Sequence, residues 1–184
     1  PISLLTVVAE NPRGFGRIIR KDDGTVTAIV EEYVATPEQL QVKELNVGGY
    51  CFDANWLWDA LQRIPKNPKK GEYYLTDTIE LAVKDGLSVH ATVMDDLEET
   101  IGVNTRVHLS EVETAMRRRI NQTHMLNGVT MIDPVSTYIE AEVTIGKDTV
   151  IMPNTFLFGK TEIGEGNVIG PNTIIRNSKV GNGC

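Results

Sequence analysis

Aliphatic residues recur at every sixth position through the last third of the chain. The series runs through Ile139, Ile145, Ile151, Leu157, Ile163, Ile169 and Ile175. A small, polar or β-branched residue stands two positions before each of them: Thr137, Val143, Thr149, Thr155, Thr161, Asn167 and Thr173. Alternate residues of a strand face the same side, so both series can line one interior. In an α-helix this repeat would drift around the axis and bury no single face, so it predicts short strands.

This period is typical of a β-helix, in which three short strands form a coil of about 18 residues and aliphatic side chains stack from coil to coil. The corners of such coils require left-handed backbone, which Gly and Asn adopt most readily. We expect corners near Gly146, Asn154, Gly159, Gly164, Gly170, Asn172 and Asn177. Hairpins in a β-sandwich are the alternative, but loop lengths there seldom keep a fixed period. An open stack exposes backbone at its last edge, so we expect further coils, a cap or a partner beyond Cys184.

Strand and helix patterns alternate in the first half of the chain. Residues 2–9 form an apolar run of strand length, and the stretch Asp22 to Gly24 separates two β-rich runs as a hairpin turn would. Further strands are predicted at 45–54 and 88–96, and helices at 36–44, 53–64 and 75–86. The alternation predicts an α/β fold with a largely parallel sheet, interrupted by the hairpin. In such sheets ligands bind at the carboxyl ends of strands.

Residues 105–126 form the longest predicted helix. Val107, Val112, Met116 and Ile120 fall within one apolar stripe of it. We expect this helix to link two domains, because the helical period gives way to the six-residue period directly after it. The sequence therefore predicts three parts: an α/β domain at 1–104, a linker helix at 105–128 and the first coils of a β-helix at 129–184.

Composition narrows the classes of partner. A net charge of −7 disfavours a nucleic-acid backbone or an anionic membrane. No apolar run approaches the roughly 18 residues of a membrane span, and no signal-like start is present, so we expect a cytoplasmic protein. The two cysteines, Cys51 and Cys184, lack metal-ligand spacing. Because the chain opens at Pro1 inside a strand pattern, we expect it to be part of a longer protein.

An α/β domain, a long bridging helix and then hexapeptide coils make an uncommon order of parts, and six motifs occur along it: "GFGRIIR", "AIVEE", "ELNVGGYCFD", "GEYYLTDTIELA", "IGVNTRVHLSEVE" and "IGPNTIIRNSKVGNGC". In this order they resemble the bacterial bifunctional family of N-acetylglucosamine-1-phosphate uridyltransferase and glucosamine-1-phosphate acetyltransferase, over essentially the whole chain. The resemblance implies part of a Rossmann-like nucleotidyltransferase domain, followed by a left-handed parallel β-helix that forms a homotrimer.

The resemblance also implies two reactions. The first domain would join UTP to N-acetylglucosamine 1-phosphate with Mg²⁺, giving UDP-N-acetylglucosamine and pyrophosphate. The second would acetylate glucosamine 1-phosphate with acetyl-CoA. The Gly-rich triphosphate loop of the family would precede Pro1, and the acetyltransferase histidine and coenzyme site would follow Cys184. We therefore assign no catalytic residue to this chain and expect it to be inactive alone.

Four substrate-binding residues are implied by the same resemblance. Gly16 would let the backbone approach the nucleotide sugar, Glu31 and Asn46 would hydrogen-bond the sugar, and Asn104 would supply an oxygen to Mg²⁺. From their local patterns alone, Gly16 reads as a strand-entry glycine, Glu31 as a solvated hairpin residue and Asn104 as a helix cap.

The motif "GEYYLTD" leaves three more residues open. Glu72, Tyr74 and Thr76 are candidates for the sugar pocket, but an ordinary helix start explains Thr76 equally well. One departure from the family stands near Glu31, where Tyr33 occupies a position at which the family usually has lysine. The orientation of the sugar or phosphate at that strand is therefore open.

Two alternative functions remain. A related sugar-1-phosphate nucleotidyltransferase with a β-helix tail would share these features, because Glu31 and Asn46 do not determine the base. A non-catalytic trimerisation or binding module would also fit the β-helix, whose flat faces can stack about a threefold axis. The three histidines, His90, His108 and His124, are interpreted as structural or solvated.

Overall fold

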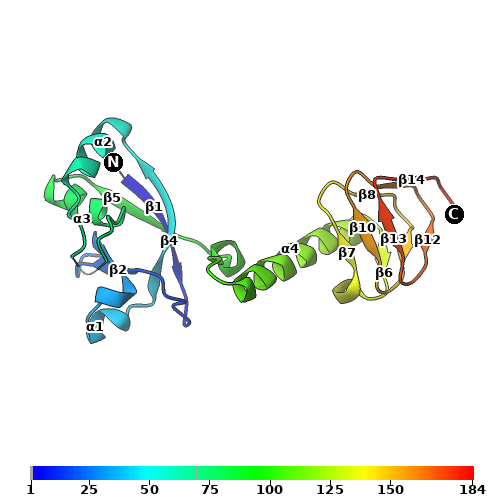
Figure 1. The fold of residues 1–184 in the computed structure, drawn as a ribbon, viewed down its shortest axis with the longest axis horizontal. Helices are drawn as coiled ribbons and strands as arrows, with labels where there is room; N and C mark the ends of the chain where they lie inside the picture. The colour runs from blue at the N-terminus through cyan, green and yellow to red at the C-terminus, as the bar shows by residue number, and fades with distance from the viewer. Residues whose placement is uncertain (1, 69) are drawn as a thin grey trace. The chain divides into compact units, whose positions relative to one another are not determined.

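The computed structural model describes residues 2–68 and 70–184. The chain divides into two compact units, Pro1–Gly102 and Val103–Cys184 (Figure 1). Unit 1 combines a sheet with helices, whereas unit 2 consists of a long helix followed by short strands. The overall α/β class expected from the sequence is confirmed.

Unit 1 contains a five-stranded sheet in the order β3-β2-β4-β1-β5. Its strands are β1 (Ile2–Val8), β2 (Arg17–Arg20), β3 (Val26–Val30), β4 (Glu44–Phe52) and β5 (Val89–Val93). Among the described strands of this sheet, β1 and β5 pair in parallel, while β1 with β4, β2 with β3 and β2 with β4 pair antiparallel.

The expectation of a largely parallel sheet is therefore wrong. The hairpin β2–β3 and the short segment after it lead the chain back toward the end of β1, so β4 runs against β1. Only the later excursion through two helices returns the chain in the direction of β1, as β5. A pattern of alternating strands and helices records the order of the elements but not the direction of each strand.

Two helices of unit 1 begin at a residue whose side chain caps them. Thr36 caps α1 (Pro37–Leu40) in a capping box with Gln39, and Asp53 caps α2 (Ala54–Arg63) by accepting from the Trp56 backbone N–H. Helix α3 (Asp77–Lys84) packs against β3 and β5. Two 3₁₀ helices, η1 (Glu32–Val34) and η2 (Leu97–Thr100), complete the unit.

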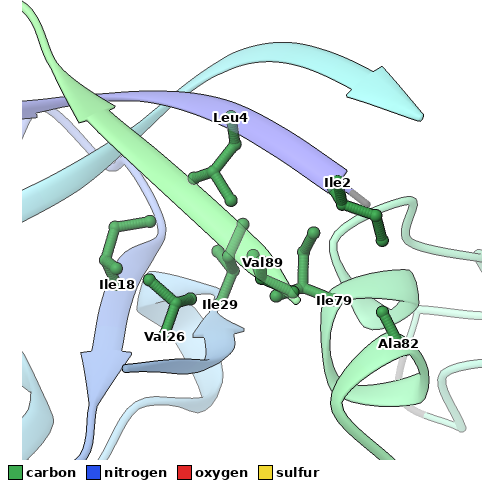
Figure 2. Packing of buried hydrophobic residues seen from close by; sticks show 8 residues of the cluster. All are labelled: Ile2, Leu4, Ile18, Val26, Ile29, Ile79, Ala82 and Val89. Atoms are coloured by element: carbon green, nitrogen blue, oxygen red, sulfur yellow. The ribbon is translucent and has the colours of Figure 1, made fainter. Parts of the chain in front are cut away.

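Helix α3 and the sheet share one apolar core, drawn in Figure 2. Ile79 and Ala82 of α3 are fully buried and face β-strand residues from across the sheet. The buried members are Ile2, Leu4, Ile18, Val26, Ile29, Ile79, Ala82 and Val89. Because these residues come from five separate elements, removing water from their side chains is what holds the unit together.

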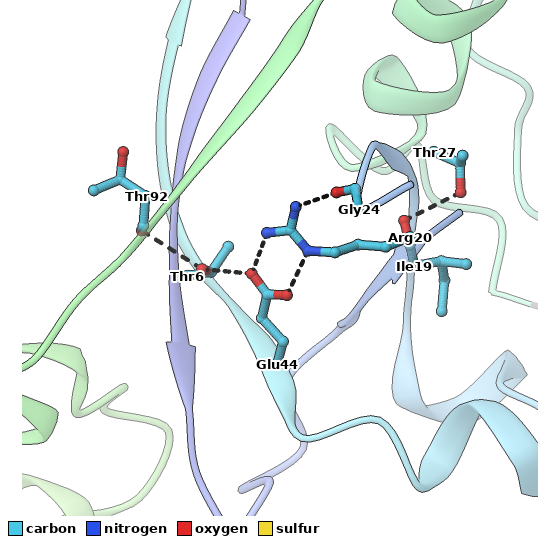
Figure 3. A network of polar contacts seen from close by, with 7 residues as sticks. All are labelled: Thr6, Ile19, Arg20, Gly24, Thr27, Glu44 and Thr92. Carbon is cyan, nitrogen blue, oxygen red and sulfur yellow. Dashed lines mark hydrogen bonds and ion pairs between the residues drawn. The ribbon is translucent and has the colours of Figure 1, made fainter. Parts of the chain in front are cut away.

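An ion pair ties the hairpin to β4 (Figure 3). The Arg20 guanidinium donates to both carboxylate oxygens of Glu44 at 2.7 Å and to the Gly24 carbonyl at 2.7 Å. Thr6 donates its hydroxyl to the same carboxylate at 2.8 Å. Gly24 has φ +84° in the turn, so the Asp-Gly hairpin predicted from the sequence is confirmed.

Unit 2 begins with α4 (Arg106–Leu126), the long helix predicted at 105–126. Thr105 caps it by accepting from the His108 backbone N–H. Ile120 packs against the core of the following strands, whereas Val107 and Met116 of the predicted apolar stripe are exposed. No helix within residues 2–68 and 70–184 has the length and apolar character needed to cross a membrane.

Nine short strands follow and form three parallel sheets, in the orders β12-β9-β6, β13-β10-β7 and β14-β11-β8. The strands are β6 (Thr130–Met131), β7 (Tyr138–Ile139), β8 (Thr144–Ile145), β9 (Val150–Ile151), β10 (Phe156–Phe158), β11 (Glu162–Ile163), β12 (Val168–Ile169), β13 (Ile174–Arg176) and β14 (Lys179–Val180). A 3₁₀ helix, η3 (Pro134–Ser136), lies between β6 and β7. The chain visits the three sheets in turn, which is the path of a β-helix.

Both side-chain series predicted to face inward do so. Ile151 and Leu157 are fully buried, and every member of the aliphatic series belongs to or packs against one core cluster. The small polar series is buried with it, because Thr149, Thr155, Thr161 and Asn167 each have 0% exposure. The sandwich alternative is excluded, since the pairing between neighbours in each sheet is parallel.

The corners follow the prediction only in part. Asn154, Gly159, Asn172 and Asn177 have positive φ as expected, and so do Asp148 and Gly166, which the sequence pattern did not indicate. Left-handed backbone was wrongly expected at Gly146, Gly164 and Gly170. At Gly146 the reason for glycine is space, because an added Cβ would lie 2.6 Å from the Glu165 nitrogen and 2.6 Å from the Gly164 carbonyl carbon.

Candidate functional site

The predicted residue Gly16 lies where three strands of unit 1 meet. Its carbonyl accepts a hydrogen bond from the backbone N–H of Asn46 at 2.8 Å. A Cβ added at Gly16 would come within 2.9 Å of Ile29 Cγ2 and 3.5 Å of the Val30 carbonyl oxygen. Glycine is therefore required by the close approach of the neighbouring strands, and it brings Asn46 beside the end of β3.

The backbone of β4 leaves regular pairing directly after Asn46. Thr6 pairs with Asn46 and Leu4 with Tyr50, so three residues of β4 stand opposite Leu5 alone. Gly48 within this bulge has φ +88°, and its N–H donates to Asn46 Oδ1 at 3.2 Å. Bulges redirect side chains at the edges of sites. The motif "NVGG" therefore fixes the side-chain amide of Asn46.

Glu31 is held at the end of β3 by a residue far away in sequence. The Thr76 hydroxyl donates to Glu31 Oε1 at 2.8 Å, and Thr76 is only 7% exposed. Thr76 occupies the N-cap position of α3, but its side chain makes no cap bond there. The helix-start explanation of Thr76 therefore accounts for its backbone and not for its hydroxyl.

Tyr50 joins these residues into one polar cluster. Asn46 Nδ2 donates to Tyr50 Oη at 2.7 Å. Burial raises the pKa of Tyr50, and the nearby charge of Glu31 raises it further, against the hydrogen bond from Asn46, which lowers it. Burial likewise raises the pKa of Asp77, with smaller contributions from Glu80 and Glu31. The cluster offers a carboxylate, an amide and hydroxyls on rigid elements, which suits the hydroxyl and amide groups of a sugar.

A second set of contacts extends the cluster along the segment before α3. The rings of Tyr33 and Tyr74 lie 5.8 Å apart, and Lys70 Nζ lies 4.2 Å from the centre of the Tyr33 ring. Asn67 Nδ2 donates to Tyr33 Oη at 2.9 Å, and Tyr74 donates to Glu72 at 2.8 Å. The neighbouring Tyr33 hydroxyl, burial and Glu72 together raise the pKa of Tyr74.

Asn104, the predicted metal ligand, belongs to unit 2 and is exposed. Its backbone N–H donates to His108 Nδ1 at 3.3 Å, while the cap of α4 is Thr105. The cap explanation of Asn104 is therefore wrong. Its grouping with Gly16, Glu31 and Asn46 stays a prediction.

Asn104 could serve as one of several ligands in a magnesium site. An amide oxygen suits Mg²⁺, which takes oxygen ligands and retains waters. No group of three or more His, Cys, Asp or Glu side chains in the described part of the chain is placed to hold a metal ion. The remaining ligands would therefore have to come from water, phosphate oxygens or protein outside these residues.

The resemblance implied Gly16, Glu31 and Asn46, and the structure places Gly16 against Asn46 and against Val30, the residue before Glu31. Sequence reasoning left Thr76 open and missed Tyr50. The sequence did mark Thr76, but as a helix cap. A threonine before an acidic helix start has this pattern whether its hydroxyl caps the helix or bonds elsewhere. Tyr50 was not singled out within the predicted strand, and its hydrogen bond with Asn46 lies across the bulge in β4.

Comparison with known proteins extends this picture. No family model matches the chain. The chain is 51% identical over 181 residues to the bifunctional protein GlmU of Geobacillus sp. (strain WCH70), covering 98% of this chain and 39% of that protein. It is 52% identical over 183 residues to bifunctional protein GlmU of Caldanaerobacter subterraneus subsp. tengcongensis, covering 100% of this chain and 40% of that protein.

The bifunctional protein GlmU of Clostridium perfringens (strain SM101 / Type A) is 52% identical over 181 residues, covering 98% of this chain and 39% of that protein. The similarity confirms the resemblance that the motifs predicted, and it includes both units. The chain spans about two fifths of the length of these curated relatives.

Proposed function

We propose that this chain is a segment of a bifunctional enzyme that makes UDP-N-acetylglucosamine. Unit 1 supplies one wall of a Rossmann-like uridyltransferase domain, and unit 2 supplies the first coils of an acetyltransferase β-helix. The observation that carries the proposal is the cluster of Gly16, Glu31, Asn46 and Thr76, gathered from four separate segments of unit 1. The similarity to bifunctional GlmU proteins over both units supports it.

The cluster would bind the sugar of N-acetylglucosamine 1-phosphate or of UDP-N-acetylglucosamine. The Glu31 carboxylate can accept from sugar hydroxyls, and the Asn46 amide can both donate and accept. Gly16 lets the neighbouring strands approach each other, because a Cβ there would lie 2.9 Å from Ile29 Cγ2. These residues bind and orient, and none of them is a nucleophile, which suits phosphoryl transfer catalysed by positioning and charge neutralisation.

Asn104 would contribute its amide oxygen to Mg²⁺, the cation of the uridyltransferase half. Bound Mg²⁺ would neutralise phosphate charge as UTP reacts. The described residues of unit 1 offer the sugar wall and not a cradle for the triphosphate, so we expect the chain alone to lack uridyltransferase activity. Acetyl-CoA would be the substrate of the other half, which unit 2 begins.

Unit 2 would form a left-handed β-helix and associate as a homotrimer in the cytoplasm. Its three parallel sheets support the β-helix. Two of the sheets differ in their outward side chains. Strands β7 and β10 carry the stacked rings of Tyr138 and Phe156, whereas β11 and β14 carry the ion pair of Glu162 and Lys179. Sedimentation of the chain tests association, and calorimetry with UDP-N-acetylglucosamine tests the alternative of a trimerisation module, which would bind no sugar.

The main experiment grafts this chain into a full-length relative. The 181 matching residues of the Clostridium perfringens protein are replaced by this sequence, and pyrophosphate release from UTP and N-acetylglucosamine 1-phosphate is measured with Mg²⁺. We expect activity, and we expect Glu31→Gln and Asn46→Ala to raise KM for the sugar phosphate. Glu10→Gln, on an exposed ion pair with Lys43, is the control. A folded graft that releases no pyrophosphate contradicts the proposal.

A second candidate is a related nucleotidyltransferase with another sugar or base. Tyr33 favours testing it, because an aromatic ring with Lys70 above it stands where the family usually has lysine. The same graft is assayed with UTP, dTTP, GTP and ATP against several hexose 1-phosphates. Preference for another pair would replace UDP-N-acetylglucosamine with that product while leaving the reaction type intact.

A further inference from the structure

A buried cation lies directly beside the candidate sugar site. Arg17 opens β2 immediately after Gly16, and its side chain is only 2% exposed. Its Nη2 donates to Glu32 Oε2 at 2.9 Å, and its Nη1 donates to the Phe15 carbonyl oxygen. Its Nε is buried and has no hydrogen-bond partner among the described residues.

A buried guanidinium needs a reason beyond stability. Taking a charge out of water costs several kcal/mol, and a well-packed apolar residue of similar volume is often as stable or more stable. Arg17 is only partly compensated, since one nitrogen lacks a partner and Glu32 is 41% exposed. The positions of its two acceptors, Phe15 and Glu32, suggest why a charged side chain is buried here.

These acceptors flank the candidate site on both sides. Phe15 precedes Gly16, and Glu32 follows Glu31. The β2–β3 ladder ends at the pair of Arg17 and Val30. Gly16 and Glu31, the next residues outward on the two strands, are therefore not paired with each other, and a gap in the ladder separates them. The guanidinium spans this gap, because one arm holds the backbone before Gly16 and the other holds the residue after Glu31.

The contacts continue on both sides of the gap. Glu31 starts the turn of η1, where its carbonyl accepts from the Val34 and Ala35 N–H groups at 3.0 and 3.1 Å. On the other side, the Phe15 ring lies so close to Gly102 that a Cβ there would be 3.0 Å from Phe15 Cε1. Displacing Arg17 would therefore move the corner that carries Glu31 and the backbone that carries Gly16.

We propose that Arg17 is a positioning residue for the sugar site, which sets the separation of Glu31 from Gly16 and Asn46 without touching the sugar. This inference rests on the proposed function of the cluster. Only a planar fork can reach two acceptors in fixed directions, whereas lysine offers a single point charge. Lysine at position 17 should therefore keep the charge and lose the positioning.

The test uses the grafted full-length protein with Arg17→Lys, Arg17→Met and Glu32→Gln. Misplacing a binding group by about 1 Å can cost roughly a hundredfold in rate, so we expect KM for N-acetylglucosamine 1-phosphate to rise about tenfold or more. KM for UTP should stay unchanged. The double variant Arg17→Met with Glu32→Gln should show no larger rise than Arg17→Met alone, because Arg17→Met already removes the donor from which Glu32 accepts.

Arg20 provides a matched control on the same strand. It also pairs with a glutamate and a backbone carbonyl, but its partners are Glu44 and Gly24 at the far end of β2 (Figure 3). Arg20→Met should lower thermal stability and leave KM for the sugar phosphate unchanged. An equal rise of KM in Arg20→Met and Arg17→Met, with both proteins folded, would overturn the proposal.

A second measurement keeps the proposal testable if the graft has no activity. In the chain itself, amide hydrogen exchange is compared between Arg17→Lys, Glu32→Gln and Arg20→Met. The Val34 and Ala35 amides, which donate to the Glu31 carbonyl, should exchange faster in the first two variants and not in the third. Unchanged exchange in Glu32→Gln and Arg17→Lys contradicts the positioning role. An inactive wild-type graft with the expected exchange pattern would instead reject only the proposed function.

Discussion

Buried polar groups are organised in opposite ways in the two units. In unit 2 they stand in a column, and the Thr149 hydroxyl donates to the Gly164 carbonyl of the next coil at 2.9 Å. In unit 1 the buried polar residues Arg17 and Thr76 each bond a different segment, and their glutamate partners are neighbours in sequence. The contacts in unit 2 recur at a regular spacing along the chain. Each contact in unit 1 joins two particular segments and has no repeat.

This difference separates two ways in which a sequence specifies polar contacts. In the repeating coils the side chains of Thr149, Thr155 and Asn167 each donate to a carbonyl 14 or 15 positions further along the chain, so one spacing describes these contacts. A cluster at strand ends needs each contributor delivered by a different element, so an error in one element moves the others. The following predictions test whether the two units respond independently and whether the cluster is the more sensitive to small changes.

The largest effects should come from matched core deletions. Leu157 and Leu4 are buried to 0% and 1% exposure in units 2 and 1. Leu157→Ala and Leu4→Ala should each lower the free energy of unfolding by about 2–5 kcal/mol, because each leaves a cavity. Calorimetry should show that each variant shifts the transition of its own unit. A common shift of both transitions by either variant would contradict the separation.

A close approach between coils should give the next largest effect. Gly146→Ala should destabilise unit 2 by about 1–3 kcal/mol, because the added methyl meets backbone atoms of Gly164 and Glu165. Gly181→Ala is the control, since a Cβ there would meet no described atom within 4 Å. The two variants are compared by urea unfolding. Equal stability would show that the stack can spread without cost.

The ion pair on the hairpin should give a smaller effect that depends on pH. The hydrogen bond from Arg20 lowers the pKa of Glu44, so its stabilising contribution is present above the unfolded pKa of about 4.3 and disappears as pH falls through the folded pKa. Glu44→Gln should cost about 1–2 kcal/mol at pH 7. Urea unfolding should show this gap closing near pH 3. A gap of constant size would exclude the charge as its source.

The smallest effect on stability should accompany a clear effect on binding. Thr76→Val removes the donor to Glu31, and α3 should persist because that hydroxyl does not cap the helix. We expect stability to fall by about 1 kcal/mol or less. In the graft, KM for the sugar phosphate should rise about two- to tenfold. Thr27→Val, which removes a hydroxyl bond to the Ile19 carbonyl, is the control and should leave KM unchanged.

The sequence predicted unit 2 closely because its information is local and repeated. The inward series needed only a count of positions, and Ile151 and Leu157 lie where that count placed them. The prediction was wrong where space rather than conformation selects the residue. Gly146 looked like a left-handed corner, but its partner Gly164 lies one coil away, and only the stacked structure shows how close the two are.

Unit 1 was predicted less completely because its contacts are not local. The elements were found, but strand direction was wrong, since no residue of β4 records which way it runs beside β1. The resemblance supplied Gly16, Glu31 and Asn46. It could not supply the bond from Thr76 to Glu31, which joins residues 45 positions apart, because the same threonine also satisfies a helix-start pattern.

The amide side chains at the coil corners have a consequence for how such a protein can change length. Asn154 donates to Asn172 exactly one turn of the stack away, at a separation of 18 positions, and Asn177 and Asn182 accept from the backbone of Lys160 and Glu165. A duplicated stretch of one full turn would find every such partner again, whereas an insertion of a few residues would misalign all of them. Insertions and deletions in unit 2 should therefore comprise whole turns. Related proteins would then differ in the number of turns and not in the number of residues per turn.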